Sequence, residues 1–251
     1  MSYERGPSLH GARLADVDFS GARLHGPDFE DSKITDGYFV NADISGDITG
    51  LRLNGVAVAP LVEAELIGRF PERAKLHAGD RDGLAEAWDI IEDRWRATLK
   101  RASSLPEPML HERVDDEWSF LETLRHLVMA TDTWLLRMVG HQSRPFHRWG
   151  VAGSFLTDPR AIGLDPDADP LLAEVLEVRR GRMDAVRATI DALTPGELER
   201  VCIPPDPPGH PREAHTVLHC LHVVLNEEWE HNQYANRDLA VLEAACGELP
   251  D

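Results

Sequence analysis

The sequence is short of positive charge, with 26 Lys and Arg residues against 44 Asp and Glu and a formal net charge of −18. Contacts to nucleic-acid phosphates need a basic surface, so this balance argues against a nucleic-acid-binding protein. Long apolar runs are also missing, since no stretch approaches the roughly 18 residues of a membrane span. The first residues, MSYERGPSLHG, lack the apolar segment of a signal peptide. We therefore expect neither a secreted nor a membrane-spanning protein.

Cysteine is scarce as well. The three cysteines, Cys202, Cys220 and Cys246, form no C-x-x-C pair, and their number is odd. Such usage argues against a disulfide framework and favours a reducing, cytoplasmic location. Nothing in the spacing of the cysteines predicts that any of them is a nucleophile.

A five-residue period runs through the N-terminal part of the chain. Every fifth residue is large and apolar: Leu14, Phe19, Leu24, Phe29, Ile34, Phe39 and Ile44. Neither a helix, with a period of 3.6, nor a strand, with a period of 2, produces this pattern. It resembles the pentapeptide-repeat family, and the resemblance implies a short right-handed β-helix over residues 1–56 with four repeats per turn and inward-pointing apolar side chains.

Seven repeats fill fewer than two turns of such a β-helix, so the repeat should need a partner surface to stay folded. We expect that surface to be the C-terminal domain or a second subunit, and the latter would make a homodimer. Some pentapeptide-repeat proteins resemble duplex DNA and bind gyrase. That hypothesis is disfavoured here, because the repeat is short and is no more acidic than the rest of the chain.

The remainder of the chain is helical in pattern. A linker over residues 57–81 contains one short helix, Leu61–Phe70, and residues 82–251 contain four long amphipathic stretches. These stretches cover about Asp82–Ser103, Trp118–Val139, Leu171–Leu193 and Arg212–Ala245. The long connections over residues 140–170 and the Pro-rich residues 203–212 are typical of functional loops. The fold class is therefore mainly α, a four-helix bundle preceded by the repeat.

Glu227 and His231 lie one turn apart on the last predicted helix and border its apolar stripe. Side chains at this spacing project side by side and can ligate one zinc-type ion. A buried Glu–His hydrogen bond, or exposure at the edge of the stripe, is the commoner explanation of this spacing alone. A rival metal stripe of His215, His219 and His222 lies on the face roughly opposite the core, where exposed or interface histidines are the commoner explanation.

Two segments resemble the DinB-like superfamily of metalloproteins, EWSFLETLRHL at residues 117–127 and NEEWEHNQY at residues 226–234. Its members are four-helix bundles with a metal-binding His on the second helix and an i, i+4 pair on the fourth. The Glu–His pair is similar to that of the mycothiol-dependent maleylpyruvate isomerase branch. The resemblance implies His126, Glu227 and His231 as ligands, with one coordination position open. Periodicity alone places His126 on the polar face of its helix and predicts that it is exposed.

The resemblance also implies a function. It suggests a divalent metal, zinc first and nickel second, and a low-molecular-weight thiol such as mycothiol that attacks an electrophilic substrate in S-transfer or isomerisation. Arg125 and Arg137 are candidates for holding an acidic group of that substrate. The alternative is a non-catalytic metal-binding or protein-interaction module that uses the repeat as a docking surface.

Overall fold

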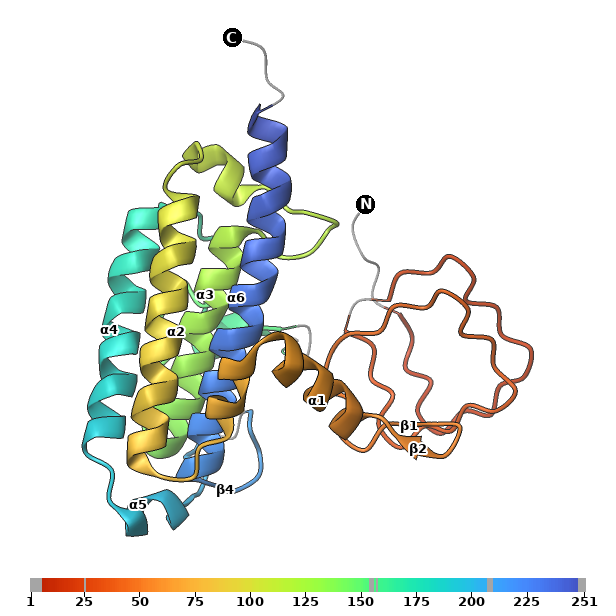
Figure 1. Cartoon of the computed structure of the whole chain (residues 1–251), viewed down its shortest axis with the longest axis horizontal. Helices are drawn as coiled ribbons and strands as arrows, with labels where there is room; N and C mark the ends of the chain where they lie inside the picture. The colour runs from red at the N-terminus through yellow and green to blue at the C-terminus, as the bar shows by residue number, and fades with distance from the viewer. Residues whose placement is uncertain (1–5, 25, 154–155, 157, 207–209, 248–251) are drawn as a thin grey trace.

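The computed structural model describes residues 6–247, except 25, 154–155, 157 and 207–209. Four long helices form a bundle: α2 (Arg81–Ala102), α3 (Phe120–Thr131), α4 (Leu172–Asp191) and α6 (Val217–Gly247). They lie side by side in Figure 1, where α3 packs against both α4 and α6. A π-helical segment, η3 (Asp132–Val139), continues α3. The mainly α fold expected from the sequence is confirmed.

The short elements connect and close the bundle. Helix α1 (Ala59–Arg69) and the 3-10 helix η1 (Pro71–His77) form the linker, and η2 (Glu107–His111), η4 (Pro159–Ile162) and α5 (Pro195–Glu199) lie in the connections. Strand β1 (Arg52–Leu53) pairs with β2 (Val56–Ala57), and β3 (Val201–Cys202) pairs with β4 (His215–Thr216). Within the described residues, no helix combines the length and hydropathy that a membrane span requires.

Local sequence sets where the helices begin. At α3 the Ser119 hydroxyl accepts a hydrogen bond from the Glu122 backbone N–H, and the Glu122 carboxylate accepts one from the Ser119 N–H. This capping box satisfies two N–H groups that the first turn leaves free. Helix α6 begins five residues later than predicted, at Val217 and not at Arg212, because His215 and Thr216 pair with β3.

Helix α3 is buried on almost every side, which corrects the expectation that His126 is exposed. His126 is only 8% exposed, and its neighbours Ala130, Thr133 and Arg137 on the same face are also buried. The connection over residues 140–170 covers this face, as the hydrogen bond from the Val151 N–H to the Arg125 carbonyl (3.3 Å) shows. Helical periodicity depends only on the residues of the helix itself, so it does not show that a loop from elsewhere in the chain covers the polar face.

The N-terminal repeat keeps its period but does not show the closed β-helix. Turns recur every ten residues, with hydrogen bonds such as those from the Ala12 N–H to the Leu9 carbonyl and from the Ala22 N–H to the Phe19 carbonyl. Among the described residues, however, the only paired strands are the two short hairpins. The seven periodic apolar side chains from Leu14 to Ile44 are 52–59% exposed. In a coil of fewer than two turns, each inner side chain is covered by a neighbouring turn on one side at most. The coil lies beside the bundle and is joined to it through α1 (Figure 1).

A buried ion pair joins α4 to α6. Arg179 and Glu228 are each 2% exposed at the side chain, and their bidentate contact includes an Nη1–Oε1 distance of 3.0 Å. The Arg179 guanidinium also lies over the Trp95 ring, 4.6 Å from its centroid. Because Glu228 follows Glu227 directly, this pair fixes the rotation of α6 at the point where the candidate ligands lie.

Replacing one member of this pair should leave the other charge buried without compensation. We expect Glu228→Leu to lower the free energy of unfolding by about 3–5 kcal/mol. The double variant Arg179→Met/Glu228→Leu should recover most of that loss, because neither charge then remains in the core. Urea unfolding followed by circular dichroism measures both, and a single variant as stable as the wild type would contradict the assignment.

Candidate metal centre

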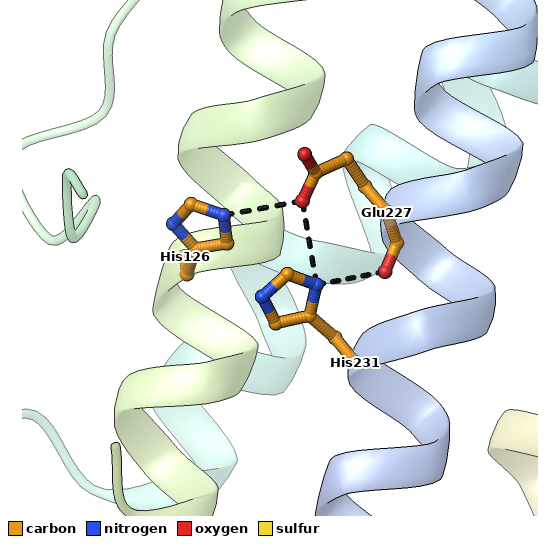
Figure 2. Close-up of side chains that lie close together, drawn as sticks. All are labelled: His126, Glu227 and His231. Atoms are coloured by element: carbon orange, nitrogen blue, oxygen red, sulfur yellow. Dashed lines mark hydrogen bonds and ion pairs between the residues drawn. The ribbon is translucent and has the colours of Figure 1, made fainter. Parts of the chain in front are cut away.

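Three side chains from two helices meet between α3 and α6 (Figure 2). His126 Nε2 lies 3.2 Å from Glu227 Oε2, and His231 Nδ1 lies 3.3 Å from the same oxygen. One ligand atom from each of the three residues can be chosen so that all lie within 4.8 Å of one another. The structure thus brings together the three residues that the resemblance nominated.

The outer hydrogen bonds leave the same nitrogen of each imidazole free. His126 Nδ1 lies 3.0 Å from the Val151 carbonyl, and His231 Nδ1 lies 2.9 Å from the Glu227 carbonyl. A carbonyl only accepts, so each Nδ1 carries the proton and donates, and each Nε2 keeps its lone pair in the neutral ring. The unprotonated Nε2 of His126 then faces a carboxylate oxygen, and only a proton or a metal cation between them makes that approach favourable.

The electrostatics of the site suit metal ligation. Burial raises the pKa of Glu227, but the hydrogen bond and charge that His126 supplies when Nε2 is also protonated, together with the charges of His231 and His210, outweigh it, so the net pKa is lowered. Burial and the charge of His126 lower the pKa of His231 to about 4. At neutral pH the pair therefore offers an anionic oxygen and a neutral imidazole, the protonation states that a metal ion requires.

Arg125 holds the loop that orients His126. Its Nε donates to the Trp149 carbonyl (2.8 Å), its Nη2 to the Asp165 carbonyl (3.4 Å), and its own carbonyl accepts from Val151. Arg137 likewise donates to the Ser143 and Pro205 carbonyls. Both candidates for substrate contact are thus engaged with backbone carbonyls, and they anchor the long loops over residues 140–170 and 203–212.

Aromatic rings wall one side of the centre while another stays open. The Trp118 ring centroid lies 4.4 Å from that of His126 and 6.0 Å from that of His231, and Tyr234 meets His231 edge-on at 5.7 Å. The Glu227 side chain nevertheless remains 31% exposed. Solvent or a small ligand can therefore reach the carboxylate.

The cysteines take no part in this site. Cys202 and Cys220 are buried, and burial together with the neighbouring Cys202 thiol raises the pKa of Cys220 to about 12. A thiol with so high a pKa is a poor nucleophile at neutral pH.

The rival histidine stripe divides into two parts. His222 Nε2 donates to the Ala78 carbonyl at 2.8 Å, whereas His215 and His219 stack on each other and pack against Trp134. In the part of the chain that the structure describes, only His126, Glu227 and His231 form a group of three metal-ligating side chains at this spacing. Sequence angles alone could not separate these histidines, because their partners come from distant segments.

Comparison with known families agrees with this geometry. The sequence matches the family model of the DinB superfamily over residues 90–235, which is more than half of the chain and includes His126, Glu227 and His231. No curated protein and no solved structure matches the sequence. The chain therefore belongs to the DinB superfamily.

Proposed function

We propose that this protein is a divalent-metal-dependent enzyme that uses a low-molecular-weight thiol in S-transfer or isomerisation. The observation that carries the proposal is the meeting of two imidazoles and a carboxylate, with the backbone carbonyls at the Nδ1 atoms and not at Nε2, and with the carboxylate partly exposed. Three protein ligands with an open position are typical of catalytic zinc sites, whereas structural zinc sites have four. Zinc is the first candidate and nickel the second.

In this account His126, Glu227 and His231 hold the ion. A divalent ion at this position would lower the pKa of a thiol bound to it, so that the thiolate nucleophile exists at neutral pH. The Val151 carbonyl and Arg125 keep His126 in its ligating tautomer, and Trp118 excludes water from one side. Mycothiol is the thiol that the resemblance suggests, the substrate would be an electrophile, and the cytoplasm is the compartment in which such a thiol is found reduced.

A second candidate is a non-catalytic metal-binding module in which the repeat is a docking surface. It is favoured by the half-exposed apolar side chains of the coil, and the occupant that fits best is a second copy of the chain. Equal five-residue periods can stack in register and continue the pentapeptide-repeat β-helix.

The metal ligands can be tested by elemental analysis of protein purified without a His tag or a chelating resin. We expect about one equivalent of zinc or nickel per chain. Glu227→Gln and His231→Gln should lose most of it, because each removes one of only three ligands. The triple variant His215→Gln/His219→Gln/His222→Gln should keep the metal. The opposite pattern would assign the metal to the histidine stripe.

The thiol can be tested on protein loaded with cobalt(II), whose absorption reports a new sulfur ligand. Adding mycothiol or bacillithiol should produce a sulfur-to-cobalt charge-transfer band in the wild type, and turnover of an electrophile should follow. The matched variant Glu230→Gln, one turn from Glu227 and bound to Arg73, should behave like the wild type. Cobalt-loaded protein that shows no charge-transfer band with either thiol would contradict the thiol-dependent enzyme and favour the non-catalytic metal-binding module.

Association through the repeat can be tested by sedimentation equilibrium of the full chain. We expect a dimer of the 28.0-kDa chain. The variant Phe19→Ser/Phe29→Ser/Phe39→Ser should be monomeric because it removes the apolar face. Tyr38→Ser should remain dimeric, since Tyr38 is 95% exposed and is not one of the seven periodic apolar residues. A monomeric wild type at tens of micromolar would exclude this occupant.

A further inference from the structure

A short stretch of the long connection, residues 147–151, lies against α3 and the start of η3 and is here named the strap. Its first N–H, that of His147, donates to Asp132 Oδ2 at 2.8 Å, and its last, that of Val151, donates to the Arg125 carbonyl at 3.3 Å. Asp132 and Arg125 lie about two turns, or ~10 Å, apart along the helix. The strap therefore runs in the opposite direction to α3 and is fixed to it at both ends.

The strap is braced internally. The Gly150 N–H donates to the His147 carbonyl (2.9 Å), and the Trp149 N–H donates to His147 Nδ1 (3.3 Å). The Trp149 carbonyl accepts a hydrogen bond from Arg125 Nε at 2.8 Å. Because these bonds tie His147 to the residues that follow it, a displacement of His147 is carried along the strap to Val151.

Gly150 sets how closely the strap approaches the helix. A Cβ atom at this position would lie 3.0 Å from Met129 Cβ and 3.0 Å from Leu164 Cδ2, which is closer than most Cβ contacts in proteins. Gly150 itself is buried. A side chain there would therefore push the strap away from α3, at the residue next to Val151.

Val151 is the point at which the strap reaches the candidate metal centre. Its carbonyl accepts the hydrogen bond of His126 Nδ1 at 3.0 Å. His126 Nε2, the ligating atom, then faces Glu227 Oε2 at 3.2 Å. The position of the strap thus decides both the tautomer and the orientation of the His126 imidazole.

Asp132, which holds the far end of the strap, is completely buried. Its side chain is 0% exposed, and Arg182 of α4 donates to Oδ1 from Nε at 2.8 Å. Apolar residues of similar volume often stabilise a protein core at least as well as a buried ion pair does. What an apolar side chain cannot supply is an acceptor for the His147 N–H. Asp132 is also the first residue of the π-helical segment, and such segments are frequent at functional sites.

We propose that Asp132 is a positioning residue for the metal ligand His126. Arg182 fixes the Asp132 carboxylate, which fixes the strap at His147. The strap in turn holds the Val151 carbonyl against His126 Nδ1, so that Nε2 stays unprotonated and directed at the metal site. This inference rests on the proposed function in one respect, the assignment of His126 as a ligand.

Two double variants of the full chain test the proposal because they differ in a single acceptor. Asp132→Asn/Arg182→Met and Asp132→Leu/Arg182→Met both remove the ion pair, and Asn and Leu are similar in size, but only Asn offers an oxygen to the His147 N–H. We expect the Leu variant to bind zinc about 10–100-fold more weakly than the Asn variant, the range seen when a partner behind a metal ligand is lost. Competition with a chromophoric chelator measures both affinities.

Nitrogen NMR of the metal-free chain gives a second readout, which a loss of stability alone would not change. We expect His126 to carry its proton on Nδ1 in the wild type and in the Asn variant. In the Leu variant the proton should move to Nε2, where it can donate to Glu227. Thermal unfolding is measured alongside, and the inference requires zinc affinity and tautomer to follow the acceptor and not the unfolding temperature.

Gly150→Ala displaces the strap but keeps Asp132 and Arg182, so it tests the inference even if the Leu variant does not fold. We expect about a tenfold loss of zinc affinity and the same change of tautomer. Gly181→Ala is the matched control, because a Cβ added at Gly181, which precedes Arg182 in α4, would meet no neighbouring atom of the described residues within 4 Å. The control should bind zinc as the wild type does.

The outcomes separate this inference from the function on which it rests. A wild type that binds no zinc overturns the proposed function, and the tautomer of His126 in the metal-free chain then still decides whether Asp132 positions that imidazole. Equal zinc affinities and equal tautomers in the Asn and Leu variants would overturn the inference and leave the metal centre intact. So would a Gly150→Ala variant that matches Gly181→Ala in both measurements.

Discussion

The hydrogen bond from His126 Nδ1 to the Val151 carbonyl is the contact on which the candidate site depends. It ties the connection over residues 140–170 to α3, and that connection in turn buries the face of α3 that carries His126. It also decides which nitrogen of His126 is protonated, and so leaves Nε2 directed at Glu227. Without the loop, His126 would be one exposed imidazole among several in this chain.

The second half of the site depends on how α6 is rotated. Glu227 and His231 face α3 because their neighbours fix the opposite side of the helix: Glu228 pairs with Arg179 of α4, and the buried Trp229 lies beneath the Arg94 guanidinium of α2. Arg179 of α4 and Arg94 of α2 thus contact the two residues of α6 that directly follow the ligand Glu227. The metal chemistry is placed on rigid helices, whereas the loops supply the orientation of His126 and the approach to the site.

The sequence predicted the parts of this structure that depend on nearby residues. The approximate bounds of α2 and α4, and of α3 taken together with η3, follow from apolar periodicity, whereas the change to a π-helix at Asp132 was not predicted. The side-by-side placement of Glu227 and His231 follows from helical spacing. The burial of His126 did not follow, because the loop that covers it begins more than a dozen residues away. For the same reason the histidine stripe looked uniform, although Ala78 holds His222 and Trp134 packs against His215 and His219. The five-residue period of the N-terminal repeat was visible in the sequence, but the structure does not show the closed β-helix that the resemblance implied.

The proposed centre is a metal ion held by two imidazole nitrogens and one carboxylate oxygen, with no protein sulfur. X-ray absorption at the zinc edge of the metal-loaded protein tests that claim most directly. We predict a light-atom shell near ~2.0–2.1 Å with the outer scattering of two imidazoles, and no sulfur near ~2.3 Å until a thiol is added. Sulfur in the absence of added thiol would place the metal at cysteine. Three or more imidazoles would place it in the histidine stripe, and either result would contradict the assignment of His126, Glu227 and His231.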